Sequence, residues 1–314
     1  MQSYLKTKPV WLQLLLFLGM ACATFMALLM VGTQVLTSIT GVNFFDIKDV
    51  SRWSNTPDMI TFIRGMLVLQ FLGMFVVPSL LFARLSDPDL KLYLGLQPPA
   101  GKIYWLLGIA ALLAAIPLVE YTGLLNREIN FGRWQGLAQS MEDEAAKQIA
   151  FMLGRTTPVD LVLNIIFIAA FAGIGEELFF RGVLQRLFIK GTRNAWAGIV
   201  ITAFLFSFFH FQFFGFLPRF LLGILLGALY WYSGSLWTAI VAHFVYDALF
   251  IVLAYFQPQL MQNPEASLFE KQHLTVVTLV SAALVGLIIW AMKKASVTVH
   301  ETDYDNPLPP SSEM

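Results

Sequence analysis

The stretch Gly175-Glu176-Glu177-Leu178-Phe179-Phe180-Arg181-Gly182 decides the fold class and the candidate site of this chain. It places three charges within six residues, inside a segment from Leu161 to Ile189 that is otherwise almost wholly apolar. A charge at the centre of a membrane-spanning helix costs roughly 2.5–3.5 kcal/mol on insertion scales. Such charges are by default interpreted as a functional site that faces the interior of a helix bundle.

Helical spacing separates the two glutamates. Glu177 and Arg181 are four residues apart with the glutamate on the N-terminal side, which is the better orientation for an ion pair. Glu176 lies about 100° around the helix from Glu177. We therefore predict a structural Glu177–Arg181 ion pair and a Glu176 carboxylate left for chemistry. The alternative is that all three charges are structural and neutralise one another and a neighbouring helix.

The composition of the whole chain agrees with a membrane protein. Of its 314 residues, 57% are hydrophobic and only 13% are charged, and the mean hydropathy is +0.68. Average soluble chains carry about 25% charged residues. The fold class predicted is all-α, a polytopic membrane helix bundle. A net charge of zero gives no indication of a nucleic-acid surface, and a single cysteine, Cys22, excludes intramolecular disulfides and a cysteine-based zinc cluster.

A membrane-spanning helix needs about 20 mostly apolar residues, and the sequence contains eight candidates. They are approximately Val10–Thr37, Met59–Leu85, Ile103–Thr122, Val159–Phe188, Ala195–Phe214, Phe216–Tyr232, Leu236–Phe256 and Leu274–Met292. The fourth has a clear start, with Thr157 as N-cap, Pro158 at the first helical position and Asp160 in the first turn. In the second, Arg64 is predicted to snorkel and Pro78 to kink the helix.

The spans divide the chain into four regions. We expect three transmembrane helices and an amphipathic connection in residues 1–158, a catalytic core in 159–256, a last transmembrane helix in 257–297 and a disordered tail in 298–314. In the connection, Ser140 to Gly154 is predicted to be a short helix with Met141, Ala145, Ile149 and Met152 on one face. It would lie at the membrane interface or pack on the bundle, and gating of substrate access is a hypothesis for it.

Lysines and arginines predict the orientation in the membrane. If the N-terminus is inside, the inner loops hold slightly more of these residues, and they lie close to the helix ends. We therefore expect a multi-pass integral protein of the bacterial plasma membrane with both termini cytoplasmic. The first apolar run is interpreted as a permanent span, since it lacks a signal-peptide cleavage site.

Ionisable residues of three spans fall at comparable depth. Glu176 lies 14 residues before Lys190, and His210 lies 15 residues after the start of the following helix. At about 1.5 Å per residue, both are roughly 21–23 Å from the turn between the two helices. His243 and Asp247 share one helix face roughly 10–18 Å into their own span. These four residues are therefore predicted to form a joint site.

The residue types indicate hydrolysis. A carboxylate and an imidazole can polarise water directly or through a divalent metal, and a second imidazole can stabilise the oxyanion of a tetrahedral intermediate. Histidine and carboxylate ligands would suit Zn²⁺ with an open position, so Glu176, His210 and His243 are candidate metal ligands. The H-E-x-x-H and G-x-S-x-G patterns of zincins and serine hydrolases are absent.

Three motifs in order carry a family resemblance. They are E-E-x-x-x-R (Glu176, Glu177, Arg181), F-x-x-x-H (Phe206, His210) and H-x-x-x-D/N (His243, Asp247). Together they resemble the CPBP family of intramembrane metalloproteases, which includes type II CAAX prenyl proteases, bacterial Abi-type proteins and lysostaphin-resistance-like proteins. The resemblance covers roughly Val159–Phe256.

The resemblance implies a bundle of about eight helices around an intramembrane cavity. It implies that Glu176 and His210 activate the attacking water and that His243 and Asp247 support the oxyanion side. The family often has Asn where this chain has Asp247, and a carboxylate cannot donate a hydrogen bond unless it is protonated. Orienting His243 or binding a metal is therefore expected of Asp247. Whether the water is bound by a metal or by the glutamate stays open.

The expected function is that of an intramembrane endopeptidase acting on a membrane-associated peptide or protein. Its expected partners are that substrate and the lipid bilayer, without nucleic acid. One alternative is a non-catalytic bacteriocin-immunity or membrane scaffold protein of the same fold. Another is an ion-coupled transporter with a relay of Glu176, His210 and Asp247, against which the lack of an internal repeat counts.

Overall fold

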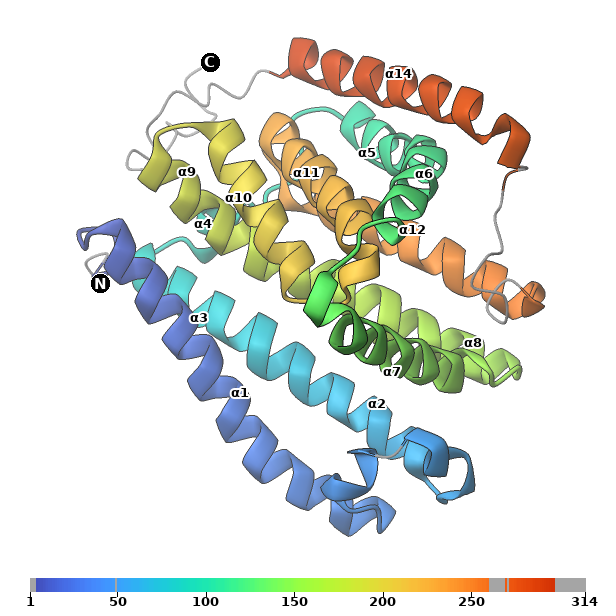
Figure 1. Ribbon diagram of the computed structural model, residues 1–314. Helices are drawn as coiled ribbons and strands as arrows, with labels where there is room; N and C mark the ends of the chain where they lie inside the picture. Colours follow the sequence, from blue (N-terminus) through green and yellow to red (C-terminus); the bar gives the residue numbers. More distant parts are fainter. Residues whose placement is uncertain (1–3, 49, 260–268, 270, 297–314) are drawn as a thin grey trace.

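The computed structural model describes residues 4–48, 50–259, 269 and 271–296, and this part of the chain is helical, without strands (Figure 1). Within it, seven helices are long and apolar enough to cross a membrane. These spans are Val10–Thr40, Met59–Ser86, Ile103–Arg127, Pro158–Thr192, Phe213–Ser233, Leu236–Phe256 and His273–Ala295. The predicted all-α polytopic bundle is confirmed.

Some spans are single helices and others consist of consecutive helical segments. The elements of the spans are α1 (Val10–Thr40), α2 (Met59–Gln70), η3 (Phe71–Val76), α3 (Val77–Ser86), α5 (Ile103–Ala114), α6 (Ile116–Arg127), α8 (Pro158–Asn164), η5 (Ile165–Ala170), η6 (Ala172–Gln185), α9 (Arg186–Thr192), α11 (Phe216–Ser233), α12 (Leu236–Phe256) and α14 (Lys271–Ala295). The elements between the spans are η1 (Phe44–Lys48), η2 (Val50–Asn55), α4 (Leu90–Leu94), η4 (Gly132–Trp134), α7 (Gln135–Leu153) and α10 (Ala195–Phe208), and η7 (Phe213–Gly215) opens the span that α11 continues. The predicted disordered tail, residues 298–314, falls outside the described residues.

The expected eighth span is a shorter helix. α10 has 14 residues, so it rises only about 21 Å, less than the hydrocarbon thickness of roughly 30 Å. The helix ends at Phe208, although the apolar run continues to Phe214. The prediction of a continuous helix over Ala195–Phe214 is therefore wrong, and the consequence for His210 is described below.

The span that carries Glu176 begins as predicted. The Thr157 hydroxyl accepts a hydrogen bond from the backbone N–H of Asp160 at 3.1 Å, and Pro158 opens the helix. Its middle is π-helical over η5 and η6. A π-helix is a wider turn with i→i+5 hydrogen bonds and is frequent at functional sites. The sequence pattern, which assumed α-helical geometry, gave no indication of this.

A glycine lets α12 approach η6 closely. A Cβ atom placed on Gly173 would lie 3.1 Å from the backbone nitrogen of Phe244. Such a contact is tighter than nine in ten of those that real Cβ atoms make. The missing side chain thus allows the backbone of α12 to pack directly against η6, one residue away from His243.

The second span differs from its prediction in one respect. The π-helical segment η3 directly precedes the turn that holds Pro78, whose ring would clash with a carbonyl four residues earlier in a regular α-helix. Nη2 of Arg64 lies 2.8 Å from Oδ1 of Asp160, so Arg64 joins α2 to α8. The sequence prediction for Arg64 did not include this partner, which a neighbouring helix supplies.

The connecting helix α7 begins at Gln135 rather than Ser140, and Oε1 of Gln135 accepts a hydrogen bond from the backbone of Phe131 at 3.0 Å. Of its predicted apolar face, Met152 is buried, while Ile149 is exposed. α7 packs against α8, α12, η2 and η7. It is therefore a helix attached to the bundle.

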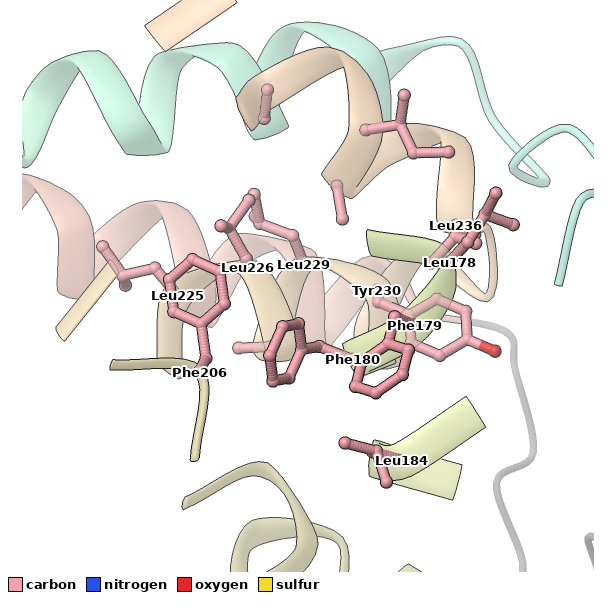
Figure 2. Packing of buried hydrophobic residues seen from close by; sticks show 14 of the residues in the cluster. Leu178, Phe179, Phe180, Leu184, Phe206, Leu225, Leu226, Leu229, Tyr230 and Leu236 are labelled. Atoms are coloured by element: carbon pink, nitrogen blue, oxygen red, sulfur yellow. The ribbon is translucent and has the colours of Figure 1, made fainter. Parts of the chain in front are cut away.

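Aromatic and aliphatic side chains pack η6 against its neighbours. Figure 2 shows this cluster, which includes Leu178, Phe179, Phe180, Leu184, Phe206, Leu225, Leu226, Leu229, Tyr230 and Leu236. The rings of Phe180 and Phe206 meet edge to face with centroids 5.2 Å apart. This packing fixes η6 relative to α10 and α11, and so holds the charged motif in place.

Candidate active site

His210 lies in the turn after α10, not inside a helix. Its backbone N–H bonds to the carbonyl of Ser207, and the next residue, Phe211, has φ of 54°. This left-handed conformation is uncommon for a bulky residue, and it ends the helix. The sequence could not reveal the end, because a run of phenylalanines continues through the turn.

The turn brings His210 beside Glu176. The Nδ1 atom of His210 lies 2.7 Å from the carbonyl oxygen of Phe206, and its Nε2 lies 4.0 Å from Oε1 of Glu176. A carbonyl oxygen only accepts, so Nδ1 carries the proton in the neutral ring and Nε2 presents a lone pair. Glu176 and His210, which the sequence analysis placed at the same depth, therefore face each other.

Glu177 connects three helices. Its Oε1 accepts hydrogen bonds from Nη1 of Arg181 at 2.7 Å and from Nδ1 of His243 at 2.9 Å. Arg181 also donates to the carbonyl of Gly223 at 2.9 Å. Both charged side chains are fully buried. The ion pair expected from spacing is present, but sequence reasoning missed that Glu177 also holds α12 through His243.

His243 lies between two carboxylates. While Nδ1 bonds to Glu177, its Nε2 lies 3.4 Å from Oδ2 of Asp247. The i,i+4 spacing on α12 brings His243 and Asp247 together, as their shared helix face indicated. The ring is thereby oriented at both of its nitrogen atoms.

The four residues line one cavity of about 260 Å³. Two polar residues that the sequence analysis did not single out, Arg219 and Tyr246, also line it. The remaining wall is apolar and consists of Leu112, Ile168, Ala172, Phe206, Leu222 and Leu226. The sequence does contain features that could have indicated both polar residues. Arg219 is a charged residue within an apolar span, and Tyr246 lies three residues after His243 and directly before Asp247.

Arg219 and Asn126 fasten the turn that carries His210. Nη1 of Arg219 donates to Oε1 of Gln212 at 2.6 Å, and its Nη2 donates to the carbonyl of Gln212. Asn126 of α6 is buried, donates to the carbonyl of Phe213 at 2.7 Å and accepts from the N–H of Leu217 at 2.8 Å. These bonds replace the helical ones that the turn lacks.

The arrangement does not fit the metal centre expected from the residue types. Among the described residues, no three or more His, Cys, Asp or Glu side chains converge on a point where a metal could bind. Both nitrogens of His243 already face carboxylate oxygens, so neither is presented to a centre shared with Glu176 and His210. The donor set is therefore best described as two neighbouring His–carboxylate groups.

Comparison with known families gives a match for part of the chain. Residues 158–249 match the model of the family described as type II CAAX prenyl endopeptidase, Rce1-like. This stretch is similar to the Rce1-like domain. It contains all four candidate residues, Glu176, His210, His243 and Asp247, and the resemblance found from the motifs is confirmed. At family level, the match within residues 158–249 supports a domain of the intramembrane CAAX-type protease kind. No curated protein and no solved structure matches the chain.

Proposed function

We propose that the chain hydrolyses a peptide bond in a membrane-associated protein or peptide, using a water activated by Glu176 and His210. The supporting observation is the 4.0 Å separation between Oε1 of Glu176 and Nε2 of His210 at the cavity wall. A water that hydrogen-bonds to both atoms at about 2.8 Å fits this separation. The apolar remainder of the wall suits a substrate segment that enters from the bilayer.

In the proposed reaction, Glu176 takes a proton from the water as general base. The water oxygen bonds to the carbonyl carbon, and the electron pair of the C=O double bond moves onto the oxygen. When the intermediate collapses, the C–N bond breaks and the leaving nitrogen receives the proton from Glu176. His210 orients the water, since its Nδ1–H is held by the carbonyl of Phe206. None of these steps passes through a metal.

The second His–carboxylate group positions the first. Glu177 and Asp247 face the two nitrogens of His243, which is the environment of a doubly protonated ring. Glu177 is adjacent to Glu176 in the chain, so its bonds to Arg181 and His243 fix the backbone that carries the general base. In this proposal Asp247 orients His243.

The test compares the wild-type protein in detergent with Glu176→Gln on a library of membrane-associated peptides. A general base contributes about 10²–10⁴-fold, so we expect a rate loss of that size. The matched control is Glu144→Gln, an exposed glutamate of α7, which should retain the wild-type rate. Equal rates for Glu176→Gln and wild type would overturn the proposal. A wild-type protein that cleaves nothing would favour the non-catalytic immunity or scaffold alternative.

We further propose that the protein resides in a bacterial plasma membrane with both termini cytoplasmic, as the lysine and arginine distribution indicates. This placement requires α10 and the turn after it to return the chain across the membrane between the spans Pro158–Thr192 and Phe213–Ser233, in addition to the seven long spans within the described residues. The α7 connection would then lie outside. A Cys22→Ser protein with Glu144→Cys should react with a membrane-impermeant maleimide added to intact cells. Labelling only after cell lysis would reverse the orientation.

A further inference from the structure

The proposed hydrolysis needs hydrogen-bond donors for the oxyanion, and the expected donors are partly engaged with other groups. His243 bonds through Nδ1 to Glu177 at 2.9 Å, and its Nε2 faces Asp247 at 3.4 Å. An oxyanion that accepts from Nε2 would lie beside the like-charged carboxylate of Asp247. The carboxylate of Asp247 is itself an acceptor. Donation from Nε2 of His243 to the oxyanion would therefore be shared with Asp247, and a further donor would strengthen the stabilisation.

Arg219 also lines the cavity, but it is engaged in holding the turn. One N–H of each terminal nitrogen donates to Gln212, which leaves one further N–H on each. Its Nε is buried without a hydrogen-bond partner and has almost no accessible surface, so a ligand in the cavity cannot reach that N–H. Any donation from Arg219 to a substrate would therefore come from a group that also positions His210.

Tyr246 offers a further donor in the same cavity. It lines the same cavity and, three residues after His243 on α12, lies on the same face of the helix. Its ring packs against Phe250 with centroids 5.0 Å apart, and only 7% of the residue is exposed. A phenol O–H is a donor, and among the described residues no group accepts a hydrogen bond from it.

We infer that Tyr246 is a catalytic residue that donates the hydrogen bond to the oxyanion. The inference rests on the proposed function. As the water oxygen bonds to the carbonyl carbon, the displaced electron pair settles on the carbonyl oxygen, and the O–H of Tyr246 bonds to that oxygen without transferring its proton. When the pair returns and the C–N bond breaks, the hydrogen bond weakens again. Preorganised donors of this kind act in the transition state.

The experiment measures kcat and KM for Tyr246→Phe, which removes only the hydroxyl. Loss of one oxyanion donor costs about 10²–10³-fold in kcat, and KM should stay near the wild-type value. Tyr255→Phe on the same helix is the matched control and should keep the wild-type kcat. The thermal midpoints of both variants establish that they are folded.

A second variant separates the donor role from packing. Asp247→Asn adds an amide donor to the same cavity, so Tyr246→Phe should cost about tenfold less in kcat when it is made in Asp247→Asn than when it is made in the wild type. Because each variant is compared with its own parent, the effect of Asp247→Asn on the orientation of His243 does not enter. An equal loss in both backgrounds would mean that the hydroxyl does not act on the oxyanion and would overturn the inference. The inference would also be overturned if Tyr246→Phe kept the kcat of the wild type while Glu176→Gln was inactive. If wild type and Glu176→Gln are equally inactive, the proposed function itself fails, and the inference with it.

Discussion

Arg219 and Gln212 form a two-point contact seven residues apart, in which the guanidinium binds both the side-chain oxygen at 2.6 Å and the backbone carbonyl of the glutamine. Gln212 lies two residues after His210, in a turn that has left the helix. The contact therefore fixes the imidazole relative to Glu176, which is on a different helix. A misplacement of about 1 Å can cost about 10²-fold in rate.

The first prediction follows from this contact. Arg219→Lys keeps the charge but cannot reproduce both bonds of the planar fork. We expect kcat to fall by about 10²-fold and amide hydrogen exchange to become faster in residues 209–217. Exchange is measured by mass spectrometry in detergent and does not depend on the substrate.

The control for this prediction is Arg133→Lys, an exposed arginine whose guanidinium lies over the ring of Trp134. It should change neither kcat nor the exchange of the turn. Unaltered exchange and kcat in Arg219→Lys would show that the turn is held by its other contacts.

The sequence predicted the fold class and the set of four residues because both depend on local patterns. Long apolar runs predict spans, and the i,i+4 spacings of Glu177 with Arg181 and of His243 with Asp247 place each pair on one face. The distance of each residue from the turn between the two antiparallel helices was enough to predict that Glu176 and His210 lie at the same level. These features follow from the rise and the turn of a helix alone.

The remaining features depend on contacts between segments that are distant in the sequence. The phenylalanine run around His210 hid the end of α10, which is determined by the backbone of Phe211 and by Arg219 from the next helix. Arg64 pairs with Asp160, 96 residues away. No periodicity in a single segment indicates such partners, and π-helical turns have no pattern that the 3.6-residue period would reveal.

The second prediction concerns the close approach of η6 and α12. Gly173→Ala places a Cβ atom 3.1 Å from the backbone of Phe244, so α12 must move outward. Overpacking of this kind costs about 1–3 kcal/mol. The His243–Glu177 bond should lengthen, and the cleavage rate should fall together with the thermal midpoint.

Gly136→Ala in α7 is its matched control, because a Cβ atom there meets nothing within 4 Å. Alanine is the better helix former, by about 0.5–1 kcal/mol, so this variant should be slightly more stable than wild type and equally active. An active, stable Gly173→Ala protein would contradict the close-packing argument.

The third prediction tests Glu177 as the connection between helices. Glu177→Gln leaves the fully buried guanidinium of Arg181 without its counter-ion, and breaking a buried pair in this way costs about 3–5 kcal/mol. We expect a marked fall in the thermal midpoint in detergent, whereas the exposed Glu144→Gln should melt like wild type. A midpoint unchanged in Glu177→Gln would mean that Arg181 is satisfied by the carbonyl of Gly223.

The last prediction concerns the metal. The expectation of Zn²⁺ bound by Glu176, His210 and His243 requires these side chains to converge, whereas His243 is oriented by Glu177 and Asp247 instead. We therefore expect cleavage to persist after exhaustive treatment with a chelator, and elemental analysis of the purified protein to give less than one zinc per chain. Structural zinc sites bind so tightly that the chelator must be removed by dialysis before Zn²⁺ is added back. The opposite result would be activity that is lost on chelation and restored by stoichiometric Zn²⁺ in the wild type but not in His243→Ala. That result would contradict the glutamate-bound water. It would establish a rearranged site in which His243 releases Asp247 to bind the metal.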